Sequence, residues 1–268
     1  MRKNIIYTMT SNLDLGQFIN FKILKRFGII TIARPEKANA LTLDMVKNLK
    51  KAIVYCQENR KIRGILLTGS GNTFTTGLDL DSIDGKDHQK VKEYEMTAAE
   101  IVSLIFYGKP TICAINGRAM GDGVAYTLCS DYRLAVKDSF FMMPEIKIGV
   151  FPGAGTVVLM SKTLGINWTK RILMFAEKIS AKIALKIGLI DEIVENNNEL
   201  MKSAMKKARF LFTKNQVILN SIKLCSNHLG NKSFPEAYEF EKKASYWFEQ
   251  ENKDSFIDNL RKELISDT

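Results

Sequence analysis

The sequence predicts an α/β protein in which a single core is followed by a helical C-terminal segment. Two continuous apolar runs, at residues 63–69 and 109–116, are typical of buried strands. A loop that contains glycine follows each run, and segments with the apolar spacing of amphipathic helices alternate with them. From about residue 154 the chain is mostly helical, and residues 200–265 carry long charged amphipathic helices. Strands and helices that alternate around one core define the α/β class.

The composition is that of a globular protein. The chain has 268 residues, of which 46% are hydrophobic and 25% charged, and this size allows one large domain or a domain with a small appendage. No apolar run approaches the roughly 20 residues of a membrane helix, and the first residues lack the apolar core of a secretory signal. The net charge of +10 suits a soluble surface, a phosphate-bearing ligand or nucleic acid, and charge alone does not separate these.

The cysteines and histidines predict free thiols and no metal site. The four cysteines are scattered in apolar runs without a C-x-x-C pair; they are Cys56, Cys113, Cys129 and Cys225. Buried free thiols are typical of a reducing compartment, so we expect a cytoplasmic protein. The two histidines, His88 and His228, lie in polar surroundings, which argues against a histidine metal site or a Ser-His triad.

The first half of the chain shows clear local signals. Residues 21–33 predict two strands around a turn near Arg26–Gly28. Thr42 is the candidate N-cap of the next helix, and residues 90–107 predict a second helix. The apolar face of the first helix is expected at Met45, Leu49, Ala52, Ile53 and Cys56, and that of the second at Val91, Tyr94, Ala98, Ile101, Val102 and Ile105.

Three loops that follow buried strands are the candidate sites of chemistry, at residues 75–79, 116–123 and 143–156. Their glycine spacing matches neither a P-loop nor a dinucleotide fingerprint. Glycine-rich turns do provide backbone N–H groups, and two such groups from different loops can form an oxyanion hole. The stretches TTGLD and MGDG are candidates for the two halves, although a glycine before a helix is more often a simple turn.

Six segments together carry a family resemblance. They are RPEKANAL (34–41), GILLTGSGNTFTTGLDL (64–80), KPTICAINGRAMGDG (109–123), CSDYRLA (129–135), PEIKIGVFPGAGT (144–156) and AKIALKIGLIDEIV (181–194). In type and order they resemble the crotonase superfamily, also called the enoyl-CoA hydratase/isomerase family. The resemblance implies a crotonase-like spiral of ββα units over residues 1–200. It also implies a helical segment over residues 201–268 that packs in a homotrimer, or in a homohexamer of two trimers.

The resemblance further implies a site for acyl-CoA thioesters. The backbone N–H groups of Leu78 and Asp122 would hold the thioester oxygen as it becomes an enolate, which stabilises the transition state selectively. The loop around EKANA resembles the segment that wraps the CoA adenine, and two C-terminal residues resemble those that reach a neighbour's CoA. The residues implied in substrate or CoA binding are Lys37, Ala38, Ala40, Thr76, Gly77, Asp79, Gly121, Pro144, Phe248 and Lys262. No cofactor is implied beyond the CoA of the substrate.

Asp122 stands where members of the family usually have glycine. The change keeps the backbone N–H group, and we expect the side chain to act as the N-cap of the helix that follows. A charged carboxylate beside a forming enolate would oppose it, so a side chain that enters the pocket should be protonated or turned away. Asp79 is expected to cap the next turn.

Glu145 is the candidate catalytic acid/base. Hydratases of the family place one glutamate where this chain has Ala125 and a second where it has Glu145. Because the first glutamate is missing, the resemblance implies double-bond isomerisation. In that reaction Glu145 alone removes a proton beside the thioester and returns it two carbons away. The apolar residues on both sides of Glu145 favour burial, which would raise the pKa of the carboxyl toward that of a useful base.

Other functions remain open at this point. Hydration of an enoyl-CoA is the alternative, with Asp79, Asp122 or an ordered water in place of the missing glutamate. More distant alternatives are acyl-CoA binding without turnover and RNA binding. One branch of the family binds RNA through lysines on its first helix, and Lys47 and Lys51 have such a spacing. A solvated helix face is the simpler interpretation of these lysines, so we expect neither a nucleic-acid nor a membrane partner.

Overall fold

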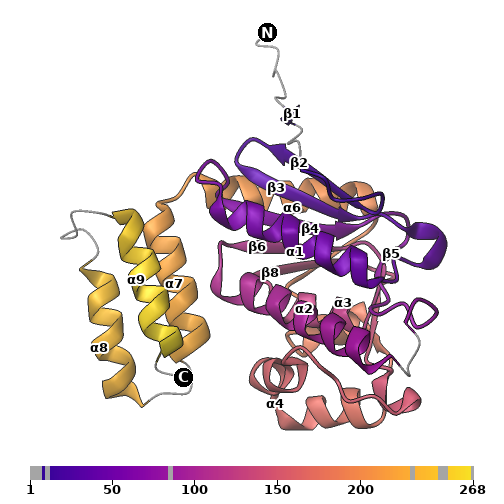
Figure 1. Cartoon of the computed structure of the whole chain (residues 1–268). Helices are drawn as coiled ribbons and strands as arrows, with labels where there is room; N and C mark the ends of the chain where they lie inside the picture. Colours follow the sequence, from indigo (N-terminus) through magenta and orange to yellow (C-terminus); the bar gives the residue numbers. More distant parts are fainter. Residues whose placement is uncertain (1–7, 10–12, 84–86, 230–232, 247–252, 267–268) are drawn as a thin grey trace.

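The computed structural model describes residues 8–9, 13–83, 87–229, 233–246 and 253–266, and in this part of the chain a seven-stranded sheet forms the centre (Figure 1). Its strands follow the order β1-β2-β3-β4-β6-β8-β11, antiparallel as far as β3 and parallel from β3 onward. Their bounds are β1 Thr8–Met9, β2 Ile19–Leu24, β3 Phe27–Ile32, β4 Gly64–Gly69, β6 Thr111–Ile115, β8 Tyr132–Val136 and β11 Glu192–Val194. The two apolar runs at residues 63–69 and 109–116 therefore become β4 and β6, as the sequence predicts.

Both faces of this sheet are buried, which explains why its strands are apolar without alternation. In β4, Ile65 and Leu67 belong to the main hydrophobic core, whereas Leu66 points to the opposite face. That opposite face is covered by α6 (Asn197–Phe212), through Leu200 and Ala204 among others. Successive side chains of a strand point to opposite faces, so a strand covered on both sides needs apolar residues at every position.

A second, smaller sheet runs beside the first and creates the spiral. It has the order β10-β9-β7-β5, and its strands are β5 Thr73–Thr75, β7 Arg118–Met120, β9 Phe140–Met142 and β10 Ile179–Ser180. The chain passes from the large sheet to the small sheet three times in succession, as β4-β5, β6-β7 and β8-β9. A helix follows each passage: α2 His88–Tyr107, α3 Asp122–Leu128 and α4 Thr156–Met174. The predicted α/β class and the spiral of ββα units are confirmed.

Local sequence signals place the first helices correctly. Helix α1 spans Leu43–Glu58, and the Thr42 hydroxyl accepts a hydrogen bond from the Met45 N–H group at 3.3 Å, so Thr42 is the predicted N-cap. The buried faces of α1 and α2 include the predicted apolar residues, except that Val91 is only half-buried. Among the described residues, no helix is both long and apolar enough to cross a bilayer.

The last helices stand apart from the sheets (Figure 1). Helices α7 (Gln216–Leu229), α8 (Phe234–Ser245) and α9 (Lys253–Ser266) share a small core of their own, which includes Leu224, Phe240 and Leu260. Lys223 ties this segment to the sheet, because its buried ammonium group lies 2.6 Å from Asp131 Oδ2. Helix α6 packs on the large sheet instead, so the predicted division between residues 200 and 201 falls inside a helix of the core. The remaining short helices are α5 Ala181–Lys186, η1 Pro35–Lys37 and η2 Glu145–Ile148.

The loop after β3 is held by one buried side chain. Asn39 is fully buried, and its Nδ2 donates to the backbone carbonyl oxygens of Ser70, Thr73 and Phe74 at 3.0, 2.6 and 3.2 Å. Its Oδ1 accepts from the Arg34 N–H group at 2.8 Å. Asn39 also has a positive φ of 54°, a left-handed conformation that asparagine tolerates better than most residues. One asparagine thus connects this loop to β5.

We expect Asn39→Ala to lower the free energy of unfolding by about 2–4 kcal/mol, because it leaves buried carbonyl groups unpaired and keeps a left-handed backbone. Asn39→Gly removes the same hydrogen bonds but relieves the backbone strain. Its free energy of unfolding should therefore be about 1 kcal/mol higher than that of Asn39→Ala. Urea unfolding of both variants checks this. Equal stability of the wild type and Asn39→Ala would contradict the structural role assigned to the side chain.

Candidate active site

The loops after β5 and β7 approach each other so closely that only glycine fits at the contact. A Cβ atom built on Gly77 would lie 2.9 Å from the Asp122 backbone nitrogen, and one built on Gly121 would lie 3.6 Å from Gly77 Cα. Both glycines also have positive φ, 77° and 53°. The parallel pairing of β5 with β7 brings the ends of these strands together. Two of the three predicted loops therefore meet through their backbones.

This contact places the predicted oxyanion-hole amides in neighbouring loops. Leu41 and Leu78 form a parallel bridge, in which the Leu41 N–H group donates to Gly77 O at 2.8 Å and Leu41 O accepts from the Asp79 N–H group at 2.9 Å. Because Leu41 bonds to the residues on either side of Leu78, the Leu78 amide itself points away from Leu41. Asp122 is the first residue of α3, where a backbone N–H group has no partner within the helix.

Glu145 comes from the third loop and lies against the same contact. A Cβ atom built on Gly121 would be 3.1 Å from Glu145 Oε1. Glu145 Oε2 is buried and accepts no hydrogen bond from a described residue. Burial raises the pKa of the Glu145 carboxyl to about 7, and the charges of Asp122 and Glu95 add to this rise, although a backbone hydrogen bond opposes it. Glu145 is only half-buried as a residue, with Oε2 as its buried atom, and its raised pKa agrees with the prediction.

The prediction that Asp122 caps α3 is wrong. Gly121 occupies the N-cap position, and no side chain caps the helix. The Asp122 carboxylate instead accepts a hydrogen bond from the Tyr94 hydroxyl on α2, with 2.5 Å between Tyr94 Oη and Asp122 Oδ2. Burial raises the pKa of Asp122, and this hydrogen bond lowers it in part. A partner 28 positions away in the sequence therefore decides the orientation of the carboxylate, and it holds Asp122 toward α2.

Glu95 is a site residue that the sequence analysis misses. It lies on α2, lines the same cavity as Glu145, and its carboxylate sits where a Cβ atom on Gly153 would be, only 1.9 Å from Glu95 Oε2. Burial raises the pKa of Glu95, and the charge of Asp122 raises it further. A signal was present in the sequence, because Val91, Glu95, Ala98 and Val102 follow the i, i+4, i+7, i+11 spacing of one helix face. A carboxylate on an apolar face is a candidate site residue.

The predicted site residues divide into two groups. One cavity of about 100 Å³ brings together Thr76, Leu78, Gly121, Asp122, Pro144 and Glu145. The others do not line that cavity: Lys37, Ala38 and Ala40 lie in the loop after β3, Gly77 forms the loop contact itself, Asp79 is in an ion pair, and Lys262 is exposed on α9. Phe248 lies outside the residues that the structure describes.

Two loop contacts connect the second group to the first. The Thr76 hydroxyl lies 3.4 Å from the carbonyl oxygen of Ala38, so the predicted CoA loop borders the cavity. Asp79 accepts from the Asp81 N–H group at 3.1 Å, which confirms that it caps the next turn. It also forms a buried ion pair with Arg34, at 2.5 Å, which the sequence did not reveal.

The lysines of α1 are engaged by neighbouring groups. Lys47 forms an ion pair with Glu93 at 2.8 Å, Lys50 forms one with Glu100, and Lys51 donates to a backbone carbonyl oxygen. Two of the three charges are thus balanced by carboxylates of α2. This pairing agrees with the simpler interpretation of the lysines, a solvated helix face.

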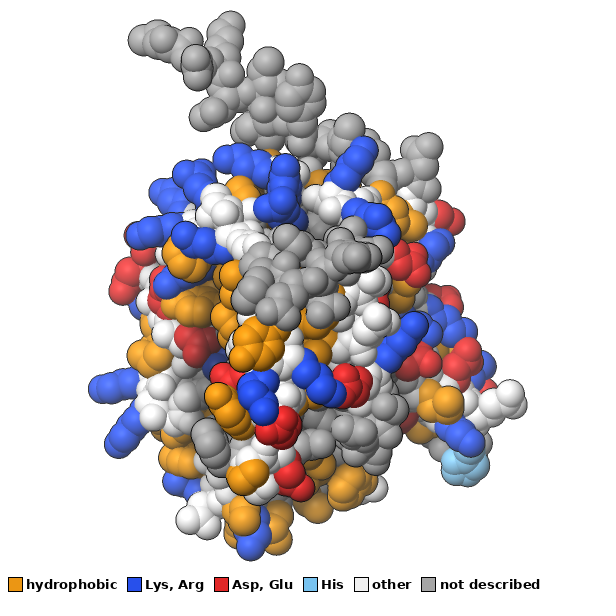
Figure 2. All heavy atoms as spheres, turned by 90° about the vertical axis from the view of Figure 1, so that its left-hand side faces the viewer, with side chains coloured by type: hydrophobic (Ala, Val, Ile, Leu, Met, Phe, Trp, Pro, Cys, Tyr) orange, Lys and Arg blue, Asp and Glu red, His pale blue; other side chains and the backbone are white. Residues whose placement is uncertain are grey.

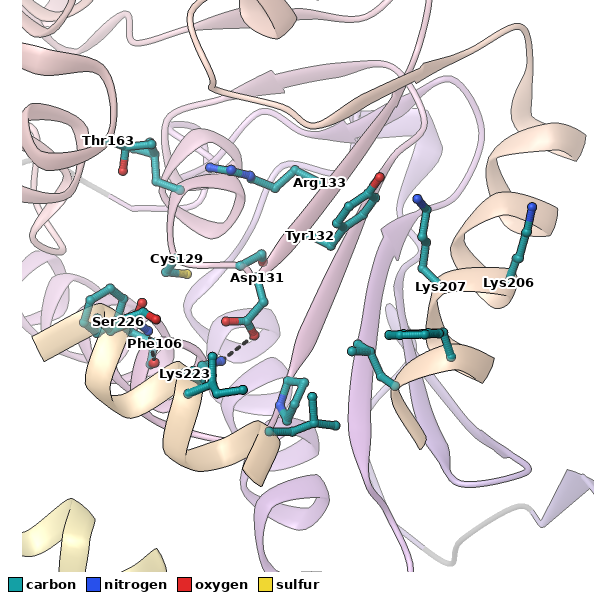
Figure 3. A pocket seen from close by; sticks show the side chains of 18 residues that line it. Phe106, Cys129, Asp131, Tyr132, Arg133, Thr163, Lys206, Lys207, Lys223 and Ser226 are labelled. Atoms are coloured by element: carbon teal, nitrogen blue, oxygen red, sulfur yellow. Dashed lines mark hydrogen bonds and ion pairs between the residues drawn. The ribbon is translucent and has the colours of Figure 1, made fainter. Parts of the chain in front are cut away.

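A larger cavity, of about 830 Å³, lies on the other side of the molecule between the start of β8, α6 and α7. Figure 3 shows Asp131 pointing to Lys223 at its wall, with Lys206 and Lys207 on the adjoining helix. None of the predicted site residues lines it. The carboxylate in its wall, Asp131, is already paired with Lys223 and accepts a hydrogen bond from the Thr111 N–H group, so it is not a free acid/base group.

The carboxyl groups around Glu145 do not form a metal site. Among the described residues, no three His, Cys, Asp or Glu side chains are arranged so that they could hold a metal ion together. The arrangement favours proton transfer instead, since it combines unpaired backbone amides with carboxyl groups whose pKa values are raised.

Comparison with known proteins places the chain in a family. The model of the family described as Enoyl-CoA hydratase/isomerase matches residues 25–261. A short-chain-enoyl-CoA hydratase of Clostridium acetobutylicum is 29% identical over 84% of this chain and 88% of its own length. A crotonyl-CoA hydratase of Syntrophomonas wolfei is 28% identical over 76% of this chain and 78% of its own length.

Solved structures show the same fold. The crystal structure of an enoyl-CoA hydratase from Bacillus anthracis has a TM-score of 0.82 to this chain and 24% identity, over 86% of this chain and 90% of that one. The family match extends over the spiral and most of the C-terminal helices. The resemblance seen in the sequence is confirmed, and the chain belongs to the enoyl-CoA hydratase/isomerase family, the crotonase superfamily.

Proposed function

We propose that the protein isomerises an enoyl-CoA, moving a double bond from the β,γ to the α,β position, with Glu145 as the base. The observation that carries this proposal is the position of Glu145. Its carboxylate lies against Gly121, beside the Asp122 amide, and one of its oxygens is buried without a hydrogen bond. A base in that position can reach a carbon next to a thioester whose oxygen is held at the amides.

The backbone amides of Leu78 and Asp122 stabilise the enolate in this mechanism. Negative charge develops on the thioester oxygen only when the α proton leaves, so fixed N–H groups at that place favour the transition state over the bound substrate. The close contact between Gly77 and the Asp122 nitrogen supports this role, because it brings both amides near one point. Asp122 contributes its N–H group, while its carboxylate is held by Tyr94.

Glu145 removes the α proton and thereby generates a dienolate. A base with a pKa of about 7 is ionised in a large fraction at neutral pH and is still strong enough to accept a proton. Ala125, buried in α3, offers no carboxyl group that could activate a water as the first glutamate of a hydratase does. In the proposed reaction no water is added, and a proton is instead returned to the substrate carbon skeleton at the γ carbon.

The CoA part of the substrate is the only cofactor-like group that this reaction needs. We place its adenine along the loop that contains Lys37, Ala38 and Ala40, which borders the cavity through Thr76. Lys262 is an exposed cation on α9 and is available to the CoA of another copy. These assignments follow the family resemblance at each position.

Hydration of an α,β-enoyl-CoA is the second candidate, and two observations favour it. The relatives of Clostridium acetobutylicum and Syntrophomonas wolfei are named hydratases. The cavity also contains Glu95 and Asp122 besides Glu145, so a second carboxyl group is at hand to activate a water.

A product assay decides between the two reactions. The purified protein receives crotonyl-CoA and, separately, a 3-enoyl-CoA, and the products are followed by mass and by the position of the double bond. We expect an unchanged mass and a shifted double bond from the 3-enoyl-CoA, and no product heavier by one water from crotonyl-CoA. A hydrated product from crotonyl-CoA would contradict the isomerase proposal and support the second candidate.

Glu145→Gln should lower kcat/KM by roughly 10²–10⁴-fold, the usual contribution of general acid/base catalysis. In the wild type, kcat/KM should rise as the pH increases toward about 7, because the base works only when it is ionised. The variant should lack this rise. Rates measured from pH 5 to 9 check both statements, with Glu93→Gln as a control on the surface of α2, where Glu93 pairs with Lys47.

The stability of Glu145→Gln separates a chemical role from a folding defect. The folded-state pKa of Glu145 lies above the ordinary value of 4.5, so its ionised form opposes folding, and this penalty appears as the pH rises through about 7. The variant should therefore be at least as stable as the wild type at pH 8. Retained isomerase activity in Glu145→Gln would rule out the proposed base.

We also propose that the C-terminal helices pack between copies in a homotrimer, or in a homohexamer of two trimers. Exposed hydrophobic side chains lie on the side of the molecule that carries these helices (Figure 2). Phe210 and Ile222 are 61% and 58% exposed and line the cavity of about 830 Å³ between α6 and α7. Large exposed apolar side chains around a hollow are typical of an interface.

Light scattering on the purified protein tests the assembly. We expect a trimer or hexamer for the wild type and dissociation to smaller species for the double variant Phe210→Glu, Ile222→Glu, because a charge placed in an apolar interface is not solvated. Lys202→Glu, exposed on α6 outside that cavity, is the matched control and should leave the assembly intact. A monomeric wild type would overturn the proposal.

A further inference from the structure

The carboxylate of Glu95 occupies a built place in the cavity. It reaches the loop after η2, where Gly153 has no side chain, and a Cβ atom there would overlap Glu95 Oε2 at 1.9 Å. The surroundings on this side are apolar and include Leu80, Val150 and Phe151. Glycine at position 153 therefore leaves the room that the carboxylate fills.

Glu95 differs from the other carboxylates of α2 in its neighbours. Glu93 and Glu100 form ion pairs with lysines of α1, on the outer side of the helix. Among the described residues no lysine or arginine pairs with Glu95; the charge of Asp122 raises the pKa of Glu95, and the charge of Glu95 raises that of Glu145. A carboxylate that has only other carboxylates as charged neighbours contributes little to stability, which points to a chemical role.

The two carboxyl groups lie against different glycines of the same cavity. Glu145 lies against Gly121, next to the amides proposed to hold the thioester oxygen. Glu95 lies against Gly153, among the apolar side chains where an acyl chain would run. Glu145 is therefore placed for the carbon beside the thioester, and Glu95 for a carbon farther along the chain.

We propose that Glu95 is a second catalytic acid/base group, which protonates the γ carbon of the dienolate after Glu145 has removed the α proton. The inference rests on the isomerase function proposed above. In the first step the C2–H bond breaks, the proton goes to Glu145, and the electron pair moves into the dienolate, with its charge on the thioester oxygen. In the second step the pair returns to form C2=C3, the former C3=C4 pair takes the proton of Glu95 at C4, and Glu95 becomes ionised.

The reaction starts from one proton held by the pair of carboxyl groups. Neighbouring carboxyls in an apolar cavity resist ionising together, and the form that reacts is the one in which Glu95 carries the proton and Glu145 is ionised. Burial and the Asp122 charge both raise the pKa of Glu95, the direction that favours a proton donor. After the product leaves, the proton on Glu145 returns to Glu95 through solvent, and the site is reset without any other reactant.

The test compares Glu95→Gln with Glu145→Gln and with the surface control Glu93→Gln. Two readouts are used: the rate of conversion of a 3-enoyl-CoA to the 2-enoyl-CoA, and the uptake of deuterium at C2 of the same substrate in D2O. We expect Glu95→Gln to lose roughly 10²–10⁴-fold in isomerisation and to keep the C2 exchange, because Glu145 still removes the α proton. Glu145→Gln should lose both, and Glu93→Gln should keep both.

The outcomes separate this inference from the function on which it rests. A wild type that does not isomerise any 3-enoyl-CoA refutes the proposed function itself. Isomerisation by Glu95→Gln at the wild-type rate refutes only the role of Glu95 and leaves Glu145 as the single acid/base. Loss of both readouts in Glu95→Gln also refutes it, since Glu95 would then act through Glu145 or through the fold. Retained C2 exchange shows that the variant is folded and binds the substrate.

Discussion

The close backbone contact between Gly77 and Gly121 is the constraint on which the site depends. A side chain on Gly77 would push the two loops apart, since its Cβ atom would lie 2.9 Å from the Asp122 nitrogen, and a Cβ atom on Gly121 would crowd Glu145 Oε1 at 3.1 Å. The contact exists because β5 and β7 pair in parallel and end at the same edge of the small sheet. The repeated passage from the large sheet to the small one thus has a chemical consequence: it brings amides from separate turns of the spiral to one point.

Much of the fold follows from local sequence signals. Residues close together along the chain determine the apolar runs of β4 and β6, the Thr42 cap and the buried helix faces. Continuous apolar runs, capping residues and the 3.6-residue helical period therefore reveal them in the sequence. The small strands β5, β7 and β9 have three residues each, too few to show a period, and the spiral was implied by resemblance alone. The buried role of Asn39 was missed because its hydrogen-bond partners at Ser70, Thr73 and Phe74 are distant in sequence.

The site shows the same division between local and distant effects. Glu145 was identified through its family position and its apolar neighbours, both of which are visible in the sequence. Asp122 was misassigned as a cap, because aspartate before a helix usually caps it and nothing near Asp122 reveals that Tyr94 holds the carboxylate instead. Glu95 was overlooked because a charged residue on a long helix is usually solvated, although its place on the apolar face of α2 could have identified it.

Charge conservation explains how several carboxyl groups can serve a reaction that passes through an anion. No described lysine or arginine is paired with Glu95, Asp122 or Glu145, so the cavity cannot accept an additional negative charge easily. When Glu145 takes the α proton, its negative charge moves to the thioester oxygen, where the backbone amides receive it. When Glu95 gives a proton to the γ carbon, the charge moves from that oxygen to Glu95. At each step the cavity contains the same total charge, and only its position changes.

A second carboxyl therefore adds a proton donor without adding a charge when it begins protonated, and burial raises the pKa of Glu95 in that direction.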